Sequence, residues 1–302
     1  MQEKLRSWLS PPDPSVNHNT ACKTQYDGTA AWFIRSSSFQ DWKNNGSLLW
    51  VRGNRTPLEP FQPSCILIYS LIAQQVLEKA FCGALFLDCL CDREFMFRIS
   101  SAIIENIKNM RKARPALIAY HYFDFKDASK RDVRGLLASL LFQLGGHSDR
   151  CQEVLYNLYI SCQDGAERPS DSALAGCLKR MLGLPGRRPT FFIIDALDEC
   201  PNTTGTPSAR EEVLNFLEDL VGSRYSNLFI CVTSRPEQDI QTVLNPLISA
   251  SRRVSLHEEG GQMEDIKSYI HSFVHMDRTM QRWREEDRKL VISILSERAD
   301  GM

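Results

Sequence analysis

The sequence has almost no excess of charge of either sign, since 36 Lys and Arg residues stand against 37 Asp and Glu residues, for a formal net charge of -1. Binding to nucleic acid or to an acidic membrane surface requires a basic excess or a basic patch, because phosphate groups attract cations. The pair Arg252-Arg253 is too short to form such a patch. We therefore expect no nucleic-acid partner.

Apolar runs long enough to cross a bilayer are also missing, since a crossing takes about 20 residues. The runs CILIYSLIAQQVL (65–77) and AFCGALFLDCL (80–90) are separated by Glu78-Lys79. The N-terminal segment is charged and then rich in proline, without the apolar stretch of a secretory signal. We expect a cytoplasmic protein without a membrane span.

The ten cysteines are scattered over 302 residues and do not form the dense pattern of a disulfide framework. Cys89 and Cys91 lack a second cysteine pair or a histidine at ligand spacing. The two cysteines are therefore expected to be apolar core residues and not metal ligands. His271 and His275 have metal-compatible spacing on a predicted helix, but no third ligand is near them in the sequence. Cys162, Cys177 and Cys231 lie in or beside apolar elements of the sequence. Cysteines in such positions are typically buried and reduced.

Short apolar segments alternate with amphipathic helical patterns over most of the chain. Strands of this kind, each followed by a helix, predict an α/β fold with a parallel sheet covered by helices on both faces. His121 lies inside one of the strands and is expected to be a core histidine. The predicted strands are 47–53, 116–123, 190–196, 227–233 and 252–256, and the predicted helices are 101–112, 130–144, 149–162, 171–183, 209–222, 236–246, 262–275 and 283–298.

The N-terminal region has a different pattern. A helix over 2–9 is expected to stop at Pro11-Pro12, and an irregular polar stretch (13–30) and a short helix near 38–43 follow. We expect three regions: 1–46 precedes the core, 47–258 forms the core with an atypical insert at 55–100, and 259–302 begins a helical region.

The segment FFIIDALDEC (191–200) carries the strongest candidate for chemistry. Its apolar residues place Asp195 at the carboxyl end of a buried strand, where α/β sheets bind ligands, and a carboxylate there can hold Mg²⁺ beside phosphates. Asp198 or Glu199 could polarise an attacking water. Acids after a strand also occur in exposed loops, but that alternative explains the buried aspartate less well.

A second candidate is LFICVTSRPE (228–237), in which Arg235 follows a buried strand. A guanidinium at this edge could sense a γ-phosphate. Ser234 and Pro236 are also typical of the start of a helix, so the arginine is the residue that this simpler interpretation leaves unexplained.

Together these segments resemble the NACHT domains of the STAND class of P-loop NTPases. FFIIDALDEC is similar to their Walker B motif, and LFICVTSRPE is similar to their sensor 1 strand. The flanks resemble the fungal branch with a nephrocystin 3-like N-terminal domain, and the resemblance covers about 4–54 and 101–302. The flanking segments that carry it are WLSPPDPSVNHNTACKTQYDGTAAWFI (8–34), FQDWKNNGSLLWVRG (39–53) and YHYFDFKDASKRDVRGLLASLLFQL (120–144).

The resemblance implies a nucleotide-driven signalling switch that uses Mg²⁺ with ATP or GTP and acts in heterokaryon incompatibility or cell death. It assigns Mg²⁺ to Asp195, catalysis to Asp198 and Glu199, and nucleotide contacts to Gly53, Asn54 and Arg235. It also implies protein partners bound through regions outside this chain, because ERADGM (297–302) falls in the middle of the family pattern.

The phosphate loop of that family, G-x-x-G-x-G-K-S/T, is missing after Gly53-Asn54, and none of the 16 glycines is followed by lysine. Without the lysine and the hydroxyl, tight binding of Mg-nucleotide is not expected. The chain is then a weak or inactive nucleotide-binding domain, or alternatively a scaffold or a truncated product without a nucleotide function.

Three interpretations of the insert 55–100 remain open. In the first, the segment is a true insertion that forms a hairpin or a partner-binding helix. In the second, it is a degenerated nucleotide site. In the third, it is translated only because an intron was retained or the reading frame was shifted. One choice of codons for QVLEKAFC (75–82) encodes Gly-Ala-Gly-Lys-Ser-Val-Leu in another frame, which permits the third interpretation. Sequencing the transcript across codons 50–105 tests the third interpretation, and an in-frame message identical to this chain would exclude it.

Overall fold

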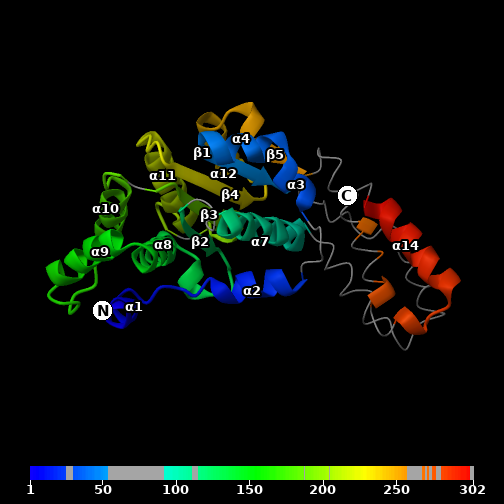
Figure 1. Cartoon of the computed structure of the whole chain (residues 1–302), viewed down its shortest axis with the longest axis horizontal. Helices are drawn as coiled ribbons and strands as arrows, with labels where there is room; N and C mark the ends of the chain where they lie inside the picture. Colours follow the sequence, from blue (N-terminus) through cyan, green and yellow to red (C-terminus); the bar gives the residue numbers. More distant parts are fainter. Residues whose placement is uncertain are drawn as a thin grey trace.

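The computed structural model describes residues 1–24, 30–53, 92–110, 115–186, 188–203 and 205–256, and parts of 267–299 (Figure 1). Its strands are β1 (Ser47–Arg52), β2 (Leu117–Tyr122), β3 (Thr190–Asp195), β4 (Leu228–Ser234) and β5 (Arg253–Ser255). Its principal helices are α1 (Gln2–Leu9), α2 (Ser15–Thr24), α3 (Ala31–Arg35), α4 (Ser37–Asn45), α7 (Asp92–Met110), α8 (Val133–His147), α9 (Asp149–Ser161), α10 (Asp171–Leu182), α11 (Ala209–Gly222), α12 (Gln238–Leu247) and α14 (Glu285–Ala299).

The five strands form one sheet in the order β2-β3-β4-β1-β5, and all its pairings are parallel. The chain leaves β1 for the far edge at β2 and later returns across β1 to reach β5. Such a reversal of direction creates a crevice at the carboxyl ends of the central strands. The predicted α/β fold with a P-loop NTPase-like parallel sheet is therefore confirmed.

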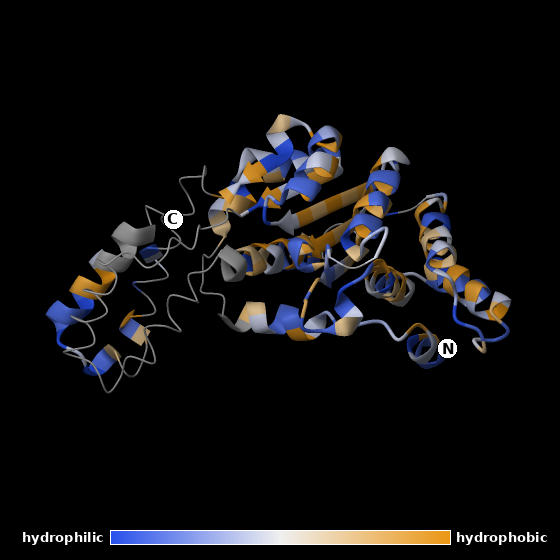
Figure 2. Ribbon diagram, turned by 180° about the vertical axis from the view of Figure 1, so that it is seen from behind, coloured by the Kyte–Doolittle hydropathy of each residue, from blue (hydrophilic) through white to orange (hydrophobic). Residues whose placement is uncertain are grey.

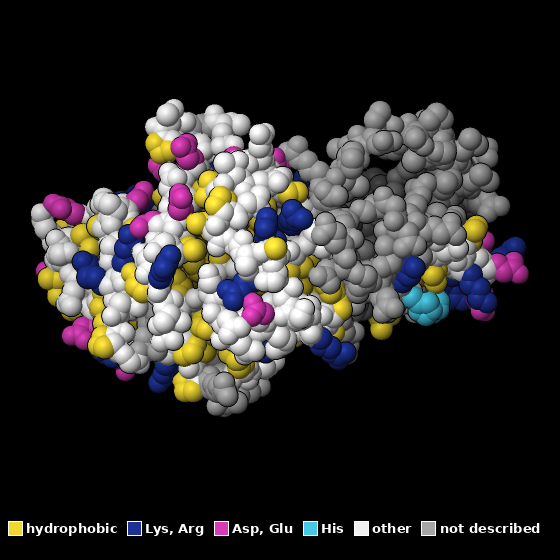
Figure 3. All heavy atoms as spheres, turned by 90° about the horizontal axis from the view of Figure 1, so that it is seen from above, with side chains coloured by type: hydrophobic (Ala, Val, Ile, Leu, Met, Phe, Trp, Pro, Cys, Tyr) yellow, Lys and Arg dark blue, Asp and Glu magenta, His cyan; other side chains and the backbone are white. Residues whose placement is uncertain are grey.

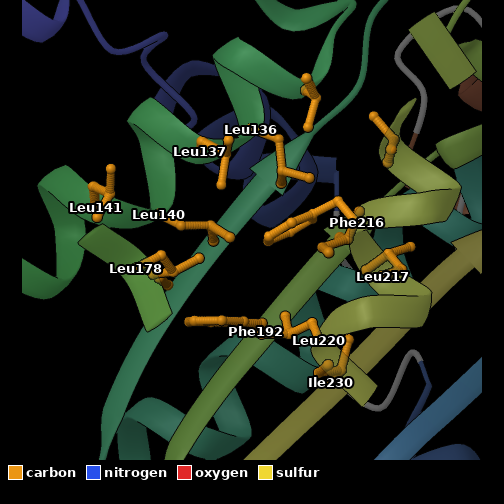
Figure 4. Close-up of a cluster of buried hydrophobic side chains, with 14 of the residues drawn as sticks. Leu136, Leu137, Leu140, Leu141, Leu178, Phe192, Phe216, Leu217, Leu220 and Ile230 are labelled. Atoms are coloured by element: carbon orange, nitrogen blue, oxygen red, sulfur yellow. The ribbon is translucent and has the colours of Figure 1, made fainter. Parts of the chain in front are cut away.

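Helices cover both faces of the sheet, because side chains of a strand alternate between the faces. On one face, α3, α4 and α7 pack through Phe33, Trp42 and Ile103 against alternate strand residues such as Phe191. On the other face, α8, α10, α11 and α12 form a larger cluster (Figure 4). Figure 2 shows the same pattern, with apolar strands between helices whose polar side is turned outward. Burial of these apolar side chains is the main driving force of the fold.

The N-terminal region differs from the prediction. The stretch after Pro12 was expected to be irregular, but residues Ser15–Thr24 form α2. Intrinsic propensity underestimates this helix, because its stability comes from contacts with α7, on which it lies (Figure 1). The region 1–46 also contributes Leu5, Phe39 and Trp42 to the two core clusters, so it is packed onto the core.

Within the described part of the chain, none of the helices has the length and apolar character that a membrane crossing requires. On the face seen in Figure 3, Lys and Arg side chains are interspersed with Asp and Glu side chains. Residues 54–91 lie outside the described residues, and with them Asn54 and the part of the insert before α7. The predicted helix 101–112 is confirmed but begins earlier, at Asp92.

His121 is the core histidine that the sequence predicted, with 1% of its surface exposed. Its Nε2 has no hydrogen-bond partner among the described residues. Burial lowers the pKa of His121 from 6.5 to about 3, although a backbone hydrogen bond with Lys130 opposes this shift. The folded state therefore holds the ring neutral, whereas the unfolded state takes up a proton below about pH 6.5.

We expect His121 to destabilise the fold as pH falls from about 6.5 towards 3, because only the unfolded state binds the extra proton there. The free energy of unfolding should lose at most about 1.4 kcal/mol per pH unit from this residue. Urea unfolding of the His121→Phe variant should show a shallower pH slope than the parent chain. His271→Phe, at an exposed position, is the matched control, and equal slopes for parent and His121→Phe would contradict the account.

Candidate functional site

The carboxyl ends of β3, β4 and β1 lie side by side at one edge of the sheet. The register pairs Arg52 of β1 with Ser234 of β4, and Ile194 of β3 with Val232 of β4. A cavity of about 450 Å³ opens at this edge. Its lining includes Met96, Phe125, Asp195, Asp198, Glu199, Asn202, Arg210, Arg235 and Glu237. The structure thus brings together four of the six residues that the sequence singled out: Asp195, Asp198, Glu199 and Arg235.

Asp195 is the most enclosed of these residues, with 3% of its surface exposed. Its Oδ1 accepts hydrogen bonds from the hydroxyl of Ser100 on α7 and from Thr233 Oγ1 on β4, the latter at 2.5 Å. Charge-assisted hydrogen bonds of this kind stabilise a buried carboxylate. Asp195 therefore ties α7 to the neighbouring strands β3 and β4.

The backbone conformation of the turn after β3 explains why a small residue, Ala196, follows Asp195. Ala196 has a φ of 55°, in the left-handed region where a large side chain is unfavourable. Its N–H donates to Thr233 Oγ1 at 3.1 Å. The turn is followed directly by a short 3₁₀ helix, Leu197–Glu199, which carries the other two acids beside the cavity.

Asp198 and Arg235 face each other across this edge. The Arg235 backbone N–H donates to Asp198 Oδ1 at 3.1 Å, and Arg235 Nε lies 3.8 Å from Asp198 Oδ2. Glu199 accepts a longer hydrogen bond of 3.4 Å from the Phe125 N–H. The arginine predicted to sense a phosphate is thus engaged with one of the predicted catalytic acids.

Gly53 extends the ladder one residue beyond β1, since its N–H donates to the Ser234 carbonyl at 3.2 Å. It lies at the same end of the sheet but is not among the residues that line the cavity. Asn54 lies outside the described residues. The functional roles of all six predicted residues remain predictions.

Arg210 is a site residue that sequence reasoning missed. It lies on α11, and its Nε donates to the Cys200 carbonyl at 2.8 Å. Its second amine donates to the Asp198 carbonyl at 2.6 Å, while the first pairs with Asp239 at 3.2 Å. Arg210 therefore clamps the loop that carries the acids onto α11 and α12. The sequence gave no sign of this role, because an arginine in the first turn of a helix is not by itself a signal of contacts with a distant loop.

The N-terminal half of α7 lies beside Asp195. Ser100 faces Asp195, and the residues one helical turn before it are Met96 and Phe97. Met96 lines the cavity, and the ring of Phe97 packs 5.1 Å from that of Tyr122. The side chains one helical turn before Ser100 are therefore apolar.

The oxygen atoms at this edge are better suited to bind a hard cation than to bind a phosphate group. The carboxylate of Asp195 and the hydroxyls of Ser100 and Thr233 are oxygen ligands of the kind that Mg²⁺ prefers. Among the described residues, the cations that line the cavity are Arg210 and Arg235, and both are engaged with acids or carbonyls.

Thiol chemistry at this edge is disfavoured. Burial raises the pKa of the Cys200 thiol to about 12, and the thiol donates to the Arg131 carbonyl at 3.0 Å. A protonated, buried thiol is a poor nucleophile.

Comparison with known families gives a match over residues 98–235 to the family described as Nephrocystin 3, N-terminal. The matched range contains Ser100, Asp195 and Arg210 and ends at Arg235, so it includes most of the site. It does not include β1 or the segment that follows β1. Comparison with curated proteins gives no match.

Substitution of Arg210 tests the clamp. Arg210→Met should lower the free energy of unfolding by about 3 kcal/mol, because it leaves two carbonyls and Asp239 without their charged partner. Lys179→Met, which removes only an exposed ion pair with Asp219, should cost less than about 1 kcal/mol. Urea unfolding measures both, and similar effects of the two substitutions would show that Arg210 is not a clamp.

Proposed function

We propose that this chain is a NACHT-like nucleotide-switch domain of a signalling protein, whose nucleotide site has lost the means to hold phosphates tightly. The observation that carries the proposal is the position of Asp195 at the carboxyl end of β3, hydrogen-bonded to Ser100 and Thr233. The match to the Nephrocystin 3, N-terminal family over 98–235 supports the same assignment.

In this proposal Asp195 is the residue that would hold Mg²⁺, together with a hydroxyl from α7. The metal would neutralise charge on the phosphates of ATP or GTP. Asp198 and Glu199 would orient a water at the edge of the cavity, and Arg235 would contact the terminal phosphate only after leaving Asp198. That exchange links the presence of a phosphate to the position of the loop between β4 and α12, as a switch requires.

A second candidate function is a scaffold that binds no nucleotide. It is favoured by the apolar side chains of Met96 and Phe97 one turn before Ser100, where the resemblance leads us to expect a lysine and a hydroxyl. The engagement of Arg235 with Asp198 favours it as well. The biological context implied by the resemblance, fungal self/non-self recognition or cell death, applies to either candidate as a proposal.

Nucleotide binding by the chain as it stands tests the proposed loss of phosphate binding, and the loop-restored variant described below separates the two candidates. The chain as it stands should show no thermal shift with Mg-ATP or Mg-GTP, because its sequence has no Gly-Lys-Ser/Thr loop to offset the charge of the β- and γ-phosphates. A clear shift in this chain would contradict the proposed loss of phosphate binding.

The matched variant replaces residues 56–99 by Gly-Ala-Gly-Lys-Ser-Val-Leu, which places the lysine and serine one turn before Ser100. In this loop-restored chain, a nucleotide at a hundred times its Kd should stabilise the fold by about 2.7 kcal/mol. Asp195→Ala in the same background should abolish hydrolysis. An active Asp195→Ala variant would overturn the metal role, whereas a folded loop-restored chain without any binding would favour the scaffold.

A further inference from the structure

Three potential metal ligands converge between α2 and α7, away from the cavity at the sheet edge. His18 and Cys22 lie one helical turn apart on α2, so they share a face of that helix. Glu105 lies on α7, which runs alongside α2 (Figure 1). His18 is buried, and Cys22 and Glu105 are partly buried.

The donor atoms of these residues lie at distances typical of one coordination sphere. His18 Nε2 is 2.9 Å from Glu105 Oε1 and 3.6 Å from Cys22 Sγ, and the three ligand atoms lie within 4.8 Å of one another. With bonds of about 2.0–2.3 Å, the ligands of one tetrahedral zinc ion lie about 3–4 Å apart. The two separations from His18 Nε2 are therefore close to those of a tetrahedral site.

A second layer of contacts orients the ligands. The other ring nitrogen of His18, Nδ1, lies 3.3 Å from the Tyr122 hydroxyl. When Nδ1 carries the proton, the lone pair of Nε2 points to the cluster, which is the tautomer that a metal needs. Ser101 Oγ lies 3.2 Å from Cys22 Sγ and can donate to a thiolate.

The protonation of the cluster is compatible with a metal. Burial lowers the pKa of His18, the hydrogen bond with Glu105 opposes this, and the charge of Lys108 lowers the pKa further. The imidazole is therefore neutral at neutral pH. Cys22 releases its thiol proton to solvent when its sulfur binds the metal.

Lys108 competes for the same position. Its Nζ lies 3.0 Å from both His18 Nε2 and Glu105 Oε1. Its side chain is 34% exposed, so it can swing into solvent when a cation takes its place. A metal at this position would thus replace one positive charge by another.

We propose that His18, Cys22 and Glu105 form a zinc site that fastens α2 to α7. One nitrogen, one thiolate sulfur and one carboxylate oxygen suit Zn²⁺, whereas Mg²⁺ and Ca²⁺ prefer oxygen ligands alone. Three protein ligands leave a fourth position for water. The site is independent of the proposed nucleotide function, although adjacent residues of α7, Ser100 and Ser101, contact Asp195 and Cys22 respectively.

Metal titration of the reduced full chain tests the proposal. The chain should bind one equivalent of Zn²⁺ by calorimetry, release about one proton, and gain thermal stability. With Co²⁺ it should show a thiolate charge-transfer band. Cys22→Ser should lose both the band and stoichiometric zinc, whereas Cys162→Ser, at the end of α9, should keep them.

Two further variants separate a metal site from a purely structural cluster. Lys108→Met should tighten zinc binding, because it removes the competing ammonium group. Tyr122→Phe should weaken it about 10- to 100-fold, because His18 loses its orienting partner. Tighter zinc binding by Lys108→Met could not be explained by misfolding, because a misfolded chain would lose the arrangement of the three ligands.

A final control addresses the histidine pair His271 and His275, whose rings lie 4.3 Å apart. A His271→Ala/His275→Ala double variant should keep the zinc. The proposal is overturned if the full chain takes up no zinc, if Cys22→Ser keeps it, or if the double variant loses it.

Discussion

The fold at its functional edge depends on one buried carboxylate. Asp195 accepts hydrogen bonds from hydroxyls on α7 and β4, and its burial is tolerated only because these donors compensate for the lost water. The same Thr233 hydroxyl also accepts from the Ala196 N–H, so the turn that presents Asp198 and Glu199 is fixed by the same group. Loss of this network would uncouple the acids from the sheet.

Arg210 supports the network from the other side. By holding the carbonyls of Asp198 and Cys200, it fixes the backbone of the loop through main-chain atoms and not through the carboxylates. Arg235 is held less firmly, since its guanidinium lies 3.8 Å from Asp198. In the proposed function, this partly exposed and loosely paired arginine would exchange Asp198 for another anion. The loop held by Arg210 is thus the more firmly fixed part of this edge, and the Arg235 side chain is the less firmly fixed part.

The apolar periodicity of the sequence was sufficient to predict the five strands and most helices, because their side chains must alternate between core and surface. It also placed Asp195, Asp198, Glu199 and Arg235 at one edge. Helix α2 was missed because its stability comes from packing on α7. Arg210 and the cluster of His18, Cys22 and Glu105 were missed because their partners are far apart in the sequence. The spacing of His18 and Cys22 on a helix was the one available signal, and the polar stretch was not interpreted as a helix.

In the proposed function, the chain keeps the metal-binding half of a nucleotide site and lacks the phosphate-binding half. The nucleotide content of the purified protein after denaturation tests this claim most directly. We expect no adenine or guanine nucleotide from this chain and a stoichiometric amount from the loop-restored chain, because only the latter has a lysine and a hydroxyl before Ser100. A stoichiometric nucleotide released from the chain as it stands would contradict the account.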